Sequence, residues 1–285
     1  MLTKENAKKA ANANKTRKPS KKEIYASFGI EYDPATGKIL CPLYGWQDPL
    51  LIDGNTKLGK GVYTWSMLPG DYTHTVYIDG EKVCVKGTCL CNCKGCYAQT
   101  GNYNFSTVKA ANARKTVLAR TYPDFIKRAI IAQIKADKIK LCRIHASGEF
   151  FDDQYIMLWH DIVTACPECL FWSYTKNAKA EAAFDDCENC NIVKSIISGY
   201  GFNYGECGYI LKVYQALKAL GKAVYICRCG IDKNQHCTTC KGCASNEIVL
   251  FIEHSTKYVA EKDPLFPVLK AVIDGQDINI ANAAD

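Results

Sequence analysis

The sequence contains no apolar run long enough to cross a bilayer and no N-terminal signal peptide. We therefore expect a cytoplasmic protein without a membrane partner. Histidine is also scarce, because the chain has five, none of them at HxH or HExxH spacing. A rolling-circle or nuclease function would need a metal site built from histidine and carboxylate ligands, so these functions have little support.

The positive and negative side chains after residue 22 cancel, so that part of the chain has no net charge. Residues 1–22 carry eight Lys and Arg side chains against one Glu, which equals the whole net charge of +7. The remaining residues therefore do not form a basic face for DNA or RNA. We interpret residues 1–22 as a flexible basic arm, which is either a solvated, partly helical tail or a contact for nucleic acid.

Cysteine, by contrast, is abundant, with 17 residues in a chain of 285. In a reducing cytosol, dense cysteines bind metals more often than they form disulfides. The odd number and the clustering into CxxC pairs also argue against a secreted disulfide scaffold. We therefore expect metal centres held by thiolates.

The first cysteine cluster is a loop with CxxxCxxC spacing, formed by Cys89, Cys93 and Cys96. Three thiolates around an iron–sulfur cubane leave one iron without a protein ligand, and a cofactor or substrate can bind there. Cys91 is an alternative fourth ligand. With it the loop would be a closed tetrathiolate, holding either zinc or a sealed iron–sulfur centre.

The second cluster combines Cys237, Cys240 and Cys243, at the CxxCxxC spacing of ferredoxin ligands, with one upstream cysteine. That fourth ligand is Cys227 or Cys229. The expected centre is an auxiliary [4Fe-4S] cluster, and the alternative is a zinc ribbon. Because this loop follows the fifth predicted strand, we expect it at the same end of the fold as the first loop.

The third cluster has two CxxC pairs separated by 17 residues, Cys166 with Cys169 and Cys187 with Cys190. This spacing is typical of zinc sites. Each pair directly precedes a predicted strand, so both pairs should lie at the N-terminal ends of neighbouring strands. We expect a structural zinc there, with unpaired thiols as the alternative. Four cysteines without such partners are expected to be packing residues: Cys41, Cys84, Cys142 and Cys207.

The order of the predicted elements indicates an α/β fold. A capping box at Ser20 to Glu23 opens a short helix and a β-hairpin follows, so residues 23–40 form a small extension. In the main domain, residues 41–285, six strands joined by helical crossovers imply a parallel arrangement, and an open partial (β/α)6 barrel fits it. The strands are expected at 62–67, 141–147, 170–175, 192–198, 223–227 and 247–252, and helices at 106–121, 123–137, 152–165 and 209–220. The first cysteine loop follows the first strand after an insertion, which is expected to be a hairpin around Ile78-Asp79-Gly80.

Polar residues follow two of these strands, at the end where such folds carry their chemistry. The candidates for cofactor binding are Ser147, Gly148 and Glu149 after the second strand, and Ser173, Thr175 and Lys176 at the end of the third. Gly148 permits close backbone approach, and Glu149 can pair with an ammonium group. The third strand offers hydrogen bonds to a ribose or carboxylate, or simply emerges into solvent. His145 would share a strand face with Ser147, as a catalytic residue or as a hydrogen-bonded core histidine.

The end of the first loop at Tyr97-Ala98, the strand from Arg143 to Glu149, the strand end at Tyr174 to Lys176 and the run from Cys227 to Cys243 resemble the gene-88-protein family of phages and mobile elements. That family is similar to radical S-adenosylmethionine (radical SAM) enzymes, in which three loop cysteines hold a [4Fe-4S] cluster and a Gly-Gly-Glu segment holds the cofactor's amino group. The chain departs from this pattern at Gly95, where an aromatic residue is usual, and at Ser147, which replaces the first glycine. The resemblance covers about residues 60–255 and implies a partial barrel of the radical SAM type.

By this resemblance, the expected function is reductive cleavage of S-adenosylmethionine, followed by hydrogen abstraction from an unknown substrate. Cys89, Cys93 and Cys96 would hold the catalytic cluster, and electrons would come from an external donor. A second [4Fe-4S] cluster and a structural zinc are the additional expected centres, and a phage-encoded protein would act in the host cytoplasm. The alternative is a non-enzymatic protein, stabilised by zinc or iron–sulfur, that binds nucleic acid through its basic arm.

Overall fold

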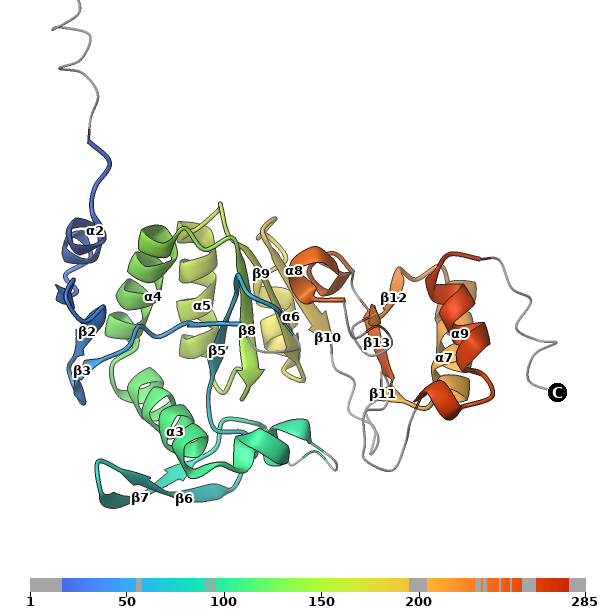
Figure 1. The fold of residues 1–285 in the computed structure, drawn as a ribbon, viewed down its shortest axis with the longest axis horizontal. Helices are drawn as coiled ribbons and strands as arrows, with labels where there is room; N and C mark the ends of the chain where they lie inside the picture. Colours follow the sequence, from blue (N-terminus) through green and yellow to red (C-terminus); the bar gives the residue numbers. More distant parts are fainter. Residues whose placement is uncertain are drawn as a thin grey trace, which may run out of the picture.

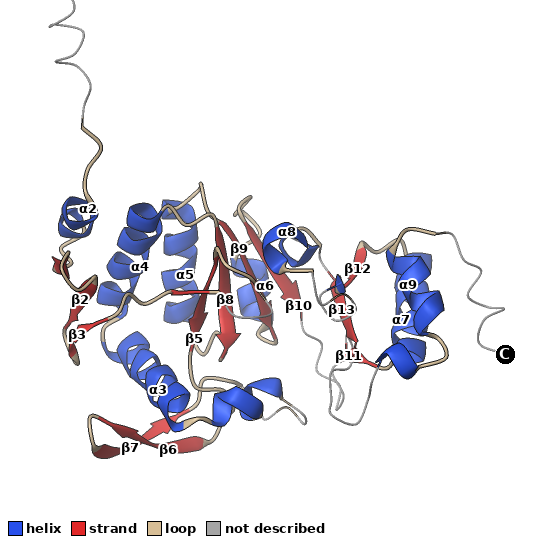
Figure 2. Cartoon of the chain, in the orientation of Figure 1, coloured by secondary structure: helices blue, strands red, loops and turns tan. Residues whose placement is uncertain are grey.

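A computed structural model describes residues 17–54, 58–90, 93, 96–194, 204–228, 232, 235–240, 242–246, 248–252 and 260–276. Figures 1 and 2 show a mixed α/β structure in which helices lie against one face of a central sheet. A smaller α/β unit, formed by residues 204–276, lies beside the last strand of that sheet. Within the described residues, the strands do not close into a barrel.

The central sheet confirms four of the six predicted strands as a parallel set. Its order is β10-β9-β8-β5-β4, and only the edge pair β4–β5 is antiparallel. The strands are β4 (Ile52–Asp53), β5 (Val62–Ser66), β8 (Leu141–Ser147), β9 (Leu170–Thr175) and β10 (Cys190–Lys194). The helices between them are α3 (Ser106–Thr121), α4 (Pro123–Asp137), α5 (Asp153–Ala165) and α6 (Ala178–Ala183).

The last two predicted strands belong to a separate parallel sheet, with the order β11-β13-β12. Its strands are β11 (Tyr204–Gly205), β12 (Val224–Ile226) and β13 (Ile248–Ile252), and its helices include α7 (Cys207–Ala219), α8 (Cys237–Cys240) and α9 (Phe266–Ile273). Val193 of β10 and Val249 of β13 share one apolar cluster, so the second sheet packs beside the edge of the first. The six strands are therefore present but divided between two sheets.

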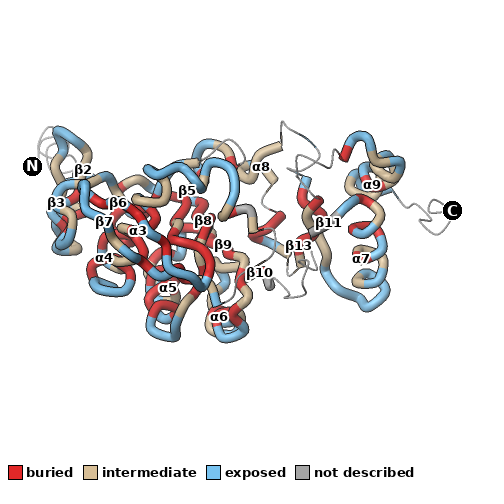
Figure 3. Tube along the Cα trace, turned by 90° about the horizontal axis from the view of Figure 1, so that it is seen from below, coloured by how far each residue is buried: buried red, intermediate tan, exposed pale blue. Residues whose placement is uncertain are grey.

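Alternation along the strands of the central sheet creates two buried faces. Cys142 of β8 and Phe171 of β9 lie in the large cluster formed with α4 and α5. Leu141 and Trp172, one residue away in each strand, lie in the cluster on the other face. Figure 3 shows buried residues concentrated in these strands and in the helices that cover them. A sheet buried on both faces is typical of parallel strands.

The N-terminal extension follows its sequence signals. Helix α2 (Lys21–Ser27) has both capping-box hydrogen bonds between Ser20 and Glu23, and β1 (Tyr32–Asp33), β2 (Lys38–Cys41) and β3 (Gly45–Gln47) form a small antiparallel sheet. The helix includes Lys21 and Lys22, which the sequence analysis assigned to the basic arm. Residues 1–16 of that arm lie outside the described residues.

A hairpin interrupts the chain between β5 and the first cysteine loop. It consists of β6 (Thr73–Ile78) and β7 (Glu81–Lys86), joined at Asp79 and Gly80, both with positive φ, as predicted from the Asp-Gly turn. The base of the hairpin is closed, because the Gly87 amide donates to the Tyr72 carbonyl over 2.9 Å. A Cβ atom at Gly87 would overlap the backbone of Pro69 and Gly70, so the two ends of the insertion lie in direct contact.

No helix in the described part of the chain is long and apolar enough to cross a membrane.

Lys115 of α3 is a lysine buried in the core, so its replacement tests how much the burial of its charge lowers the stability of the fold. Its Nζ has no hydrogen-bond partner among the described residues and lies 5.2 Å from the centre of the Trp65 ring. Burial lowers the pKa of Lys115 to about 8. The folded state therefore disfavours the charged form, and this penalty develops as pH falls from about 10.5 to 8.

We expect Lys115→Met to raise the free energy of unfolding by up to about 3 kcal/mol at pH 7, where the penalty is complete. The gain should shrink towards zero above pH 10.5, where the lysine is neutral in both states. Denaturant unfolding at both pH values measures this, with the exposed Lys218→Met on α7 as the control. A gain independent of pH would contradict the burial penalty.

Candidate functional site

The first cysteine loop begins beside the C-terminal end of β5. After the hairpin, the Thr88 amide donates to the Leu68 carbonyl over 2.9 Å, and the Cys89 amide donates to the Gly70 carbonyl over 3.0 Å. These bonds hold Cys89 next to the residues that directly follow β5. The loop therefore lies at the C-terminal edge of the central sheet, as the sequence predicted.

Glu149 connects this loop to β8 and β9. Its carboxylate accepts hydrogen bonds from the Thr175 hydroxyl (2.6 Å) and from the amides of Lys176 and Phe150 (2.9 Å each). Its own amide donates to the Thr88 hydroxyl over 3.1 Å. The side chain is 6% exposed. The three motifs predicted at the ends of the first three strands thus meet at Glu149, whose backbone amide binds the first loop and whose carboxylate binds the end of β9.

The electrostatics of this site disfavour further negative charge. Burial raises the pKa of Glu149, and this effect outweighs the three hydrogen bonds, which lower the pKa. Burial also raises the pKa of Cys89 to about 12, and the charge of Glu149 adds to this effect. Burial raises the pKa of Cys96, whereas Lys176 lowers it. Thiolates and a carboxylate held together in a poorly solvated place are stabilised by a positively charged group, such as a metal centre or an ammonium.

The cysteines of the first loop are half-buried at positions 89, 93 and 96. Cys91, the alternative fourth ligand, and Gly95 lie outside the described residues. The loop is followed by the 3-10 helices η1 (Tyr97–Gln99) and η2 (Gly101–Asn104), and the Tyr103 hydroxyl donates to the Ala146 carbonyl over 3.2 Å. That bond ties the far end of the loop to β8.

Both predicted serines already donate their hydroxyl protons to neighbouring strands. Ser147 donates to the Met67 carbonyl and Ser173 to the Ile144 carbonyl, each over 2.8 Å, and both side chains are buried. Any contact that they make with a cofactor would use the oxygen lone pairs. Thr175 is similarly engaged with Glu149, so it positions the carboxylate.

His145 points into the core. It has a positive φ of 60°, which interrupts the alternation of β8, and its Nε2 lies 2.9 Å from the Tyr155 hydroxyl of α5. Its ring packs edge-on against Phe150 and Trp159. Burial lowers the pKa of His145 to about 3. Of the two predicted roles, this geometry favours the hydrogen-bonded core histidine.

The structure brings four cysteines of the second cluster together. Cys227, Cys237, Cys240 and Cys243 all line one cavity of about 10 Å³, closed on one side by Trp172 of β9. A space of this size accommodates about one water molecule, and a cubane would require the thiols to move apart. Cys229, the other proposed upstream ligand, lies outside the described residues.

The position of this cluster differs from the prediction. The Thr238 hydroxyl of α8 lies 3.3 Å from the Leu58 carbonyl and 3.1 Å from the Lys60 carbonyl, and both residues precede β5. The cluster therefore lies at the N-terminal end of the central sheet, opposite the first loop (Figure 1). The prediction was wrong because β12 belongs to the second sheet, so its end does not share an edge with β5.

The third cluster lies at the N-terminal ends of β9 and β10, which are adjacent and parallel as predicted. Cys166 and Cys169 are buried, and Cys187 and Cys190 pack against the same apolar cluster. Sequence analysis missed Cys142 of β8, which lies close enough for the charges of Cys169, Cys190 and Cys166 to raise its pKa, after burial itself. Strand pairing explains this, because Cys142 and Cys190 both lie opposite Phe171.

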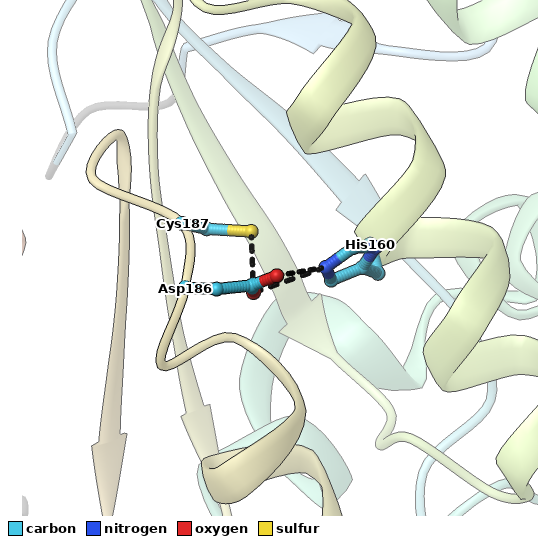
Figure 4. Close-up of side chains that lie close together, drawn as sticks. All are labelled: His160, Asp186 and Cys187. Carbon is cyan, nitrogen blue, oxygen red and sulfur yellow. Dashed lines mark hydrogen bonds and ion pairs between the residues drawn. The ribbon is translucent and has the colours of Figure 1, made fainter.

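One further group was not predicted. His160 of α5, Asp186 and Cys187 present ligand atoms that all lie within 4.8 Å of one another (Figure 4). The His160 Nε2 is 3.1 Å from Asp186, and the Cys187 thiol is 3.5 Å from the same carboxylate. No sequence spacing indicates this group, because the histidine and the aspartate are 26 residues apart on different elements.

Comparison with known proteins gives one match. The model of the family described as Gene product 88 matches residues 49–247. No curated protein and no solved structure is significantly similar to the chain. The match spans the first loop, Glu149, the end of β9 and the second and third cysteine clusters.

Gly148 allows a test of how the site is built. It has a φ of +93°, and a Cβ atom there would lie 2.8 Å from the Thr88 hydroxyl and 3.0 Å from the Met67 Cβ. We expect Gly148→Ala to lower the free energy of unfolding by about 1–2 kcal/mol for the backbone and by about 1–3 kcal/mol more for the contacts.

The control for this prediction is Gly80→Ala in the β6–β7 turn, where φ is +88° and no atom lies within 4 Å of the added Cβ. Chemical denaturation of both variants separates the two contributions. Equal losses would mean that the close approach of Thr88 and Met67 to Gly148 adds nothing to stability.

Proposed function

The chain belongs to the gene product 88 family, and we propose that it is an iron–sulfur enzyme of the radical SAM type. The observation that supports this proposal is the meeting of three motifs at Glu149. A three-cysteine loop, a Ser-Gly-Glu turn and a polar strand end come together at the C-terminal edge of parallel strands. Ligands of open parallel sheets bind at that edge.

In this proposal, Cys89, Cys93 and Cys96 provide the three thiolates of a [4Fe-4S] cluster. When bound, the cluster would supply one electron from an external donor to S-adenosylmethionine, which would be split into methionine and a 5′-deoxyadenosyl radical that abstracts hydrogen from the substrate. The chain itself holds the reactants and limits access of water. The partial barrel of this enzyme type is part of the proposal, with β5, β8, β9 and β10 as four of its strands.

Glu149 is proposed to bind the ammonium group of the cofactor. A carboxylate offers about four lone pairs, and three of them are used by Thr175, Phe150 and Lys176. Among the contacts of the described residues, one acceptor position on Oε2 therefore remains for a cationic donor. The raised pKa of Glu149 through burial also means that an ammonium, which favours the ionised form, is a suitable partner.

The second cluster has a separate role in this proposal. Cys227, Cys237, Cys240 and Cys243 line a cavity at the other end of the sheet, so their metal would not contact the cofactor. We assign them an additional centre that joins the second sheet to Trp172. Either zinc or a second iron–sulfur cluster satisfies four thiolate ligands.

The first test is metal content. Replacing Cys89, Cys93 or Cys96 with alanine should lower the iron content by about four atoms per chain, the iron of one [4Fe-4S] cluster. Each replacement should also abolish formation of 5′-deoxyadenosine by the anaerobically reconstituted, reduced protein. Cys91→Ala should retain both, because a fourth protein thiolate would block the position for the cofactor. The exposed Cys84→Ala on β7 is the control.

A colourless wild-type protein that contains zinc but no iron would contradict the enzyme proposal. It would favour the alternative of a metal-stabilised nucleic-acid-binding protein, which predicts salt-dependent DNA or RNA binding that is lost with the basic arm.

The second test is cofactor affinity. Glu149→Gln keeps an acceptor for Thr175 but removes the charge, so the affinity for S-adenosylmethionine should fall by about 1.5–3 kcal/mol, or roughly ten- to a hundredfold, with iron unchanged. Equilibrium binding to the reconstituted protein measures this. Glu168→Gln, which makes the same change at an exposed carboxylate beside the opposite end of β9, is the matched control. Unchanged affinity in Glu149→Gln would remove this residue from the cofactor site.

A further inference from the structure

The third cysteine cluster is not used by the proposed reaction, and its backbone has a regular construction. Cys166–Cys169 and Cys187–Cys190 form two equivalent turns, in which the amide of the last cysteine donates to the carbonyl of the first, over 3.0 Å and 3.1 Å. The first turn leads into β9 and the second into β10. Because these strands are adjacent and parallel, the turns lie side by side.

Asn189, within the second turn, holds the two turns together. Its side-chain amide donates to the carbonyls of Cys166 and Cys169, each over 3.0 Å, and to Val163 at the end of α5 over 3.1 Å. The backbone carbonyl of Asn189 accepts a hydrogen bond from the Phe171 amide over 2.8 Å. One side chain thus fixes the first turn, the second turn and the end of α5 relative to one another.

No disulfide joins the cysteines of the two turns, and all four pack in or against one apolar cluster. Cys166 and Cys169 are 0% exposed, and Cys187 and Cys190 pack against the same residues. Two braced CxxC turns that share a buried face supply four soft ligands from two rigid segments, which is the ligand set of a structural zinc site.

We propose that Cys166, Cys169, Cys187 and Cys190 bind one zinc-class ion, and that Asn189 is a positioning residue for this site. Among the described residues, the cysteine sulfurs of this set are not yet gathered within 4.8 Å of one another, and the Cys187 thiol donates to Asp186 (Figure 4), so side chains of the set must turn inwards when the ion binds. The ion would link α5, β9 and β10 at the end of the sheet opposite Glu149. Its role is structural and does not depend on the proposed reaction.

His160 and Asp186 offer a competing ligand set. Together with Cys187 they could bind an ion through one nitrogen, one oxygen and one sulfur, with the fourth position open. The two sets share Cys187 but differ in the number of thiolates. Cobalt(II) reports this number, because each thiolate ligand adds sulfur-to-metal charge-transfer absorption.

The experiment compares full-length variants for zinc per chain and for cobalt spectra. Cys166→Ser and Cys190→Ser should each bind one zinc ion per chain fewer than the wild-type protein. When the cobalt(II) spectrum of either variant is subtracted from that of the wild type, the difference should be that of a tetrahedral site with four thiolates. His160→Gln and the exposed Cys84→Ser should keep the zinc. Asn189→Ala should retain the spectrum but bind the ion about ten- to a hundredfold more weakly, as outer-shell partners of metal ligands do.

Three outcomes would overturn this proposal. One is a wild-type protein with the same zinc content as Cys166→Ser. Another is loss of the ion in His160→Gln with retention in Cys166→Ser, which would identify the mixed site of His160, Asp186 and Cys187. The third is an unchanged affinity in Asn189→Ala, which would remove its positioning role. Iron content and 5′-deoxyadenosine formation are separate readouts, so failure here leaves the proposed function untouched.

Discussion

A carboxylate that is buried away from water needs hydrogen bonds from donors of the protein itself. This requirement organises the C-terminal edge of the sheet. For Glu149 the donors are two backbone amides and the Thr175 hydroxyl, and the Glu149 amide is in turn bound by Thr88. Phe150 follows Glu149 directly, Thr175 and Lys176 stand together at the end of β9, and Thr88 precedes the first cysteine. The carboxylate of Glu149 therefore joins β8 to β9 and its backbone amide joins both to the first cysteine loop, because an unpaired donor or acceptor there would cost about 1–3 kcal/mol.

The two ends of the central sheet are chemically different. The end with Glu149 combines thiols, a carboxylate and the cationic Lys176, and the described residues leave one acceptor position of that carboxylate unused. The other end carries two sets of four cysteines, one on each face of the sheet. Thiolate sets that lie in apolar clusters suit closed, structural centres, whereas the mixed, partly open site suits chemistry. Phe171 and Trp172 are neighbours in β9 whose side chains lie on opposite faces of the sheet, each in the apolar cluster of one cysteine set.

Local signals predicted the elements well. The bounds of α3 and α4 agree with the prediction, since Pro123 marks the first turn of α4, and the Asp79-Gly80 turn placed the β6–β7 hairpin. Of the cysteine sets, the second is seen to line one cavity. The division of six strands into two sheets was not predictable, because periodicity identifies a strand but does not identify the strand beside it. For the same reason the predicted position of the second cysteine cluster was wrong, and no sequence pattern indicated the His160–Asp186 contact.

The closed base of the β6–β7 hairpin has a consequence for variation among related chains. Thr88 and Cys89 take their positions from Leu68 and Gly70, on the strand side of the insertion, and not from the hairpin itself. The turn of this hairpin is thus free to vary, whereas its buried face is not, because Val76, Ile78 and Val85 pack with Ala113 of α3. The turn can lengthen, shorten or acquire a new binding surface while the cysteine loop keeps its place, because the cost of a longer closed loop grows only slowly with length. Diversity in this family should therefore concentrate in the turn of the hairpin, beside a constant cluster loop.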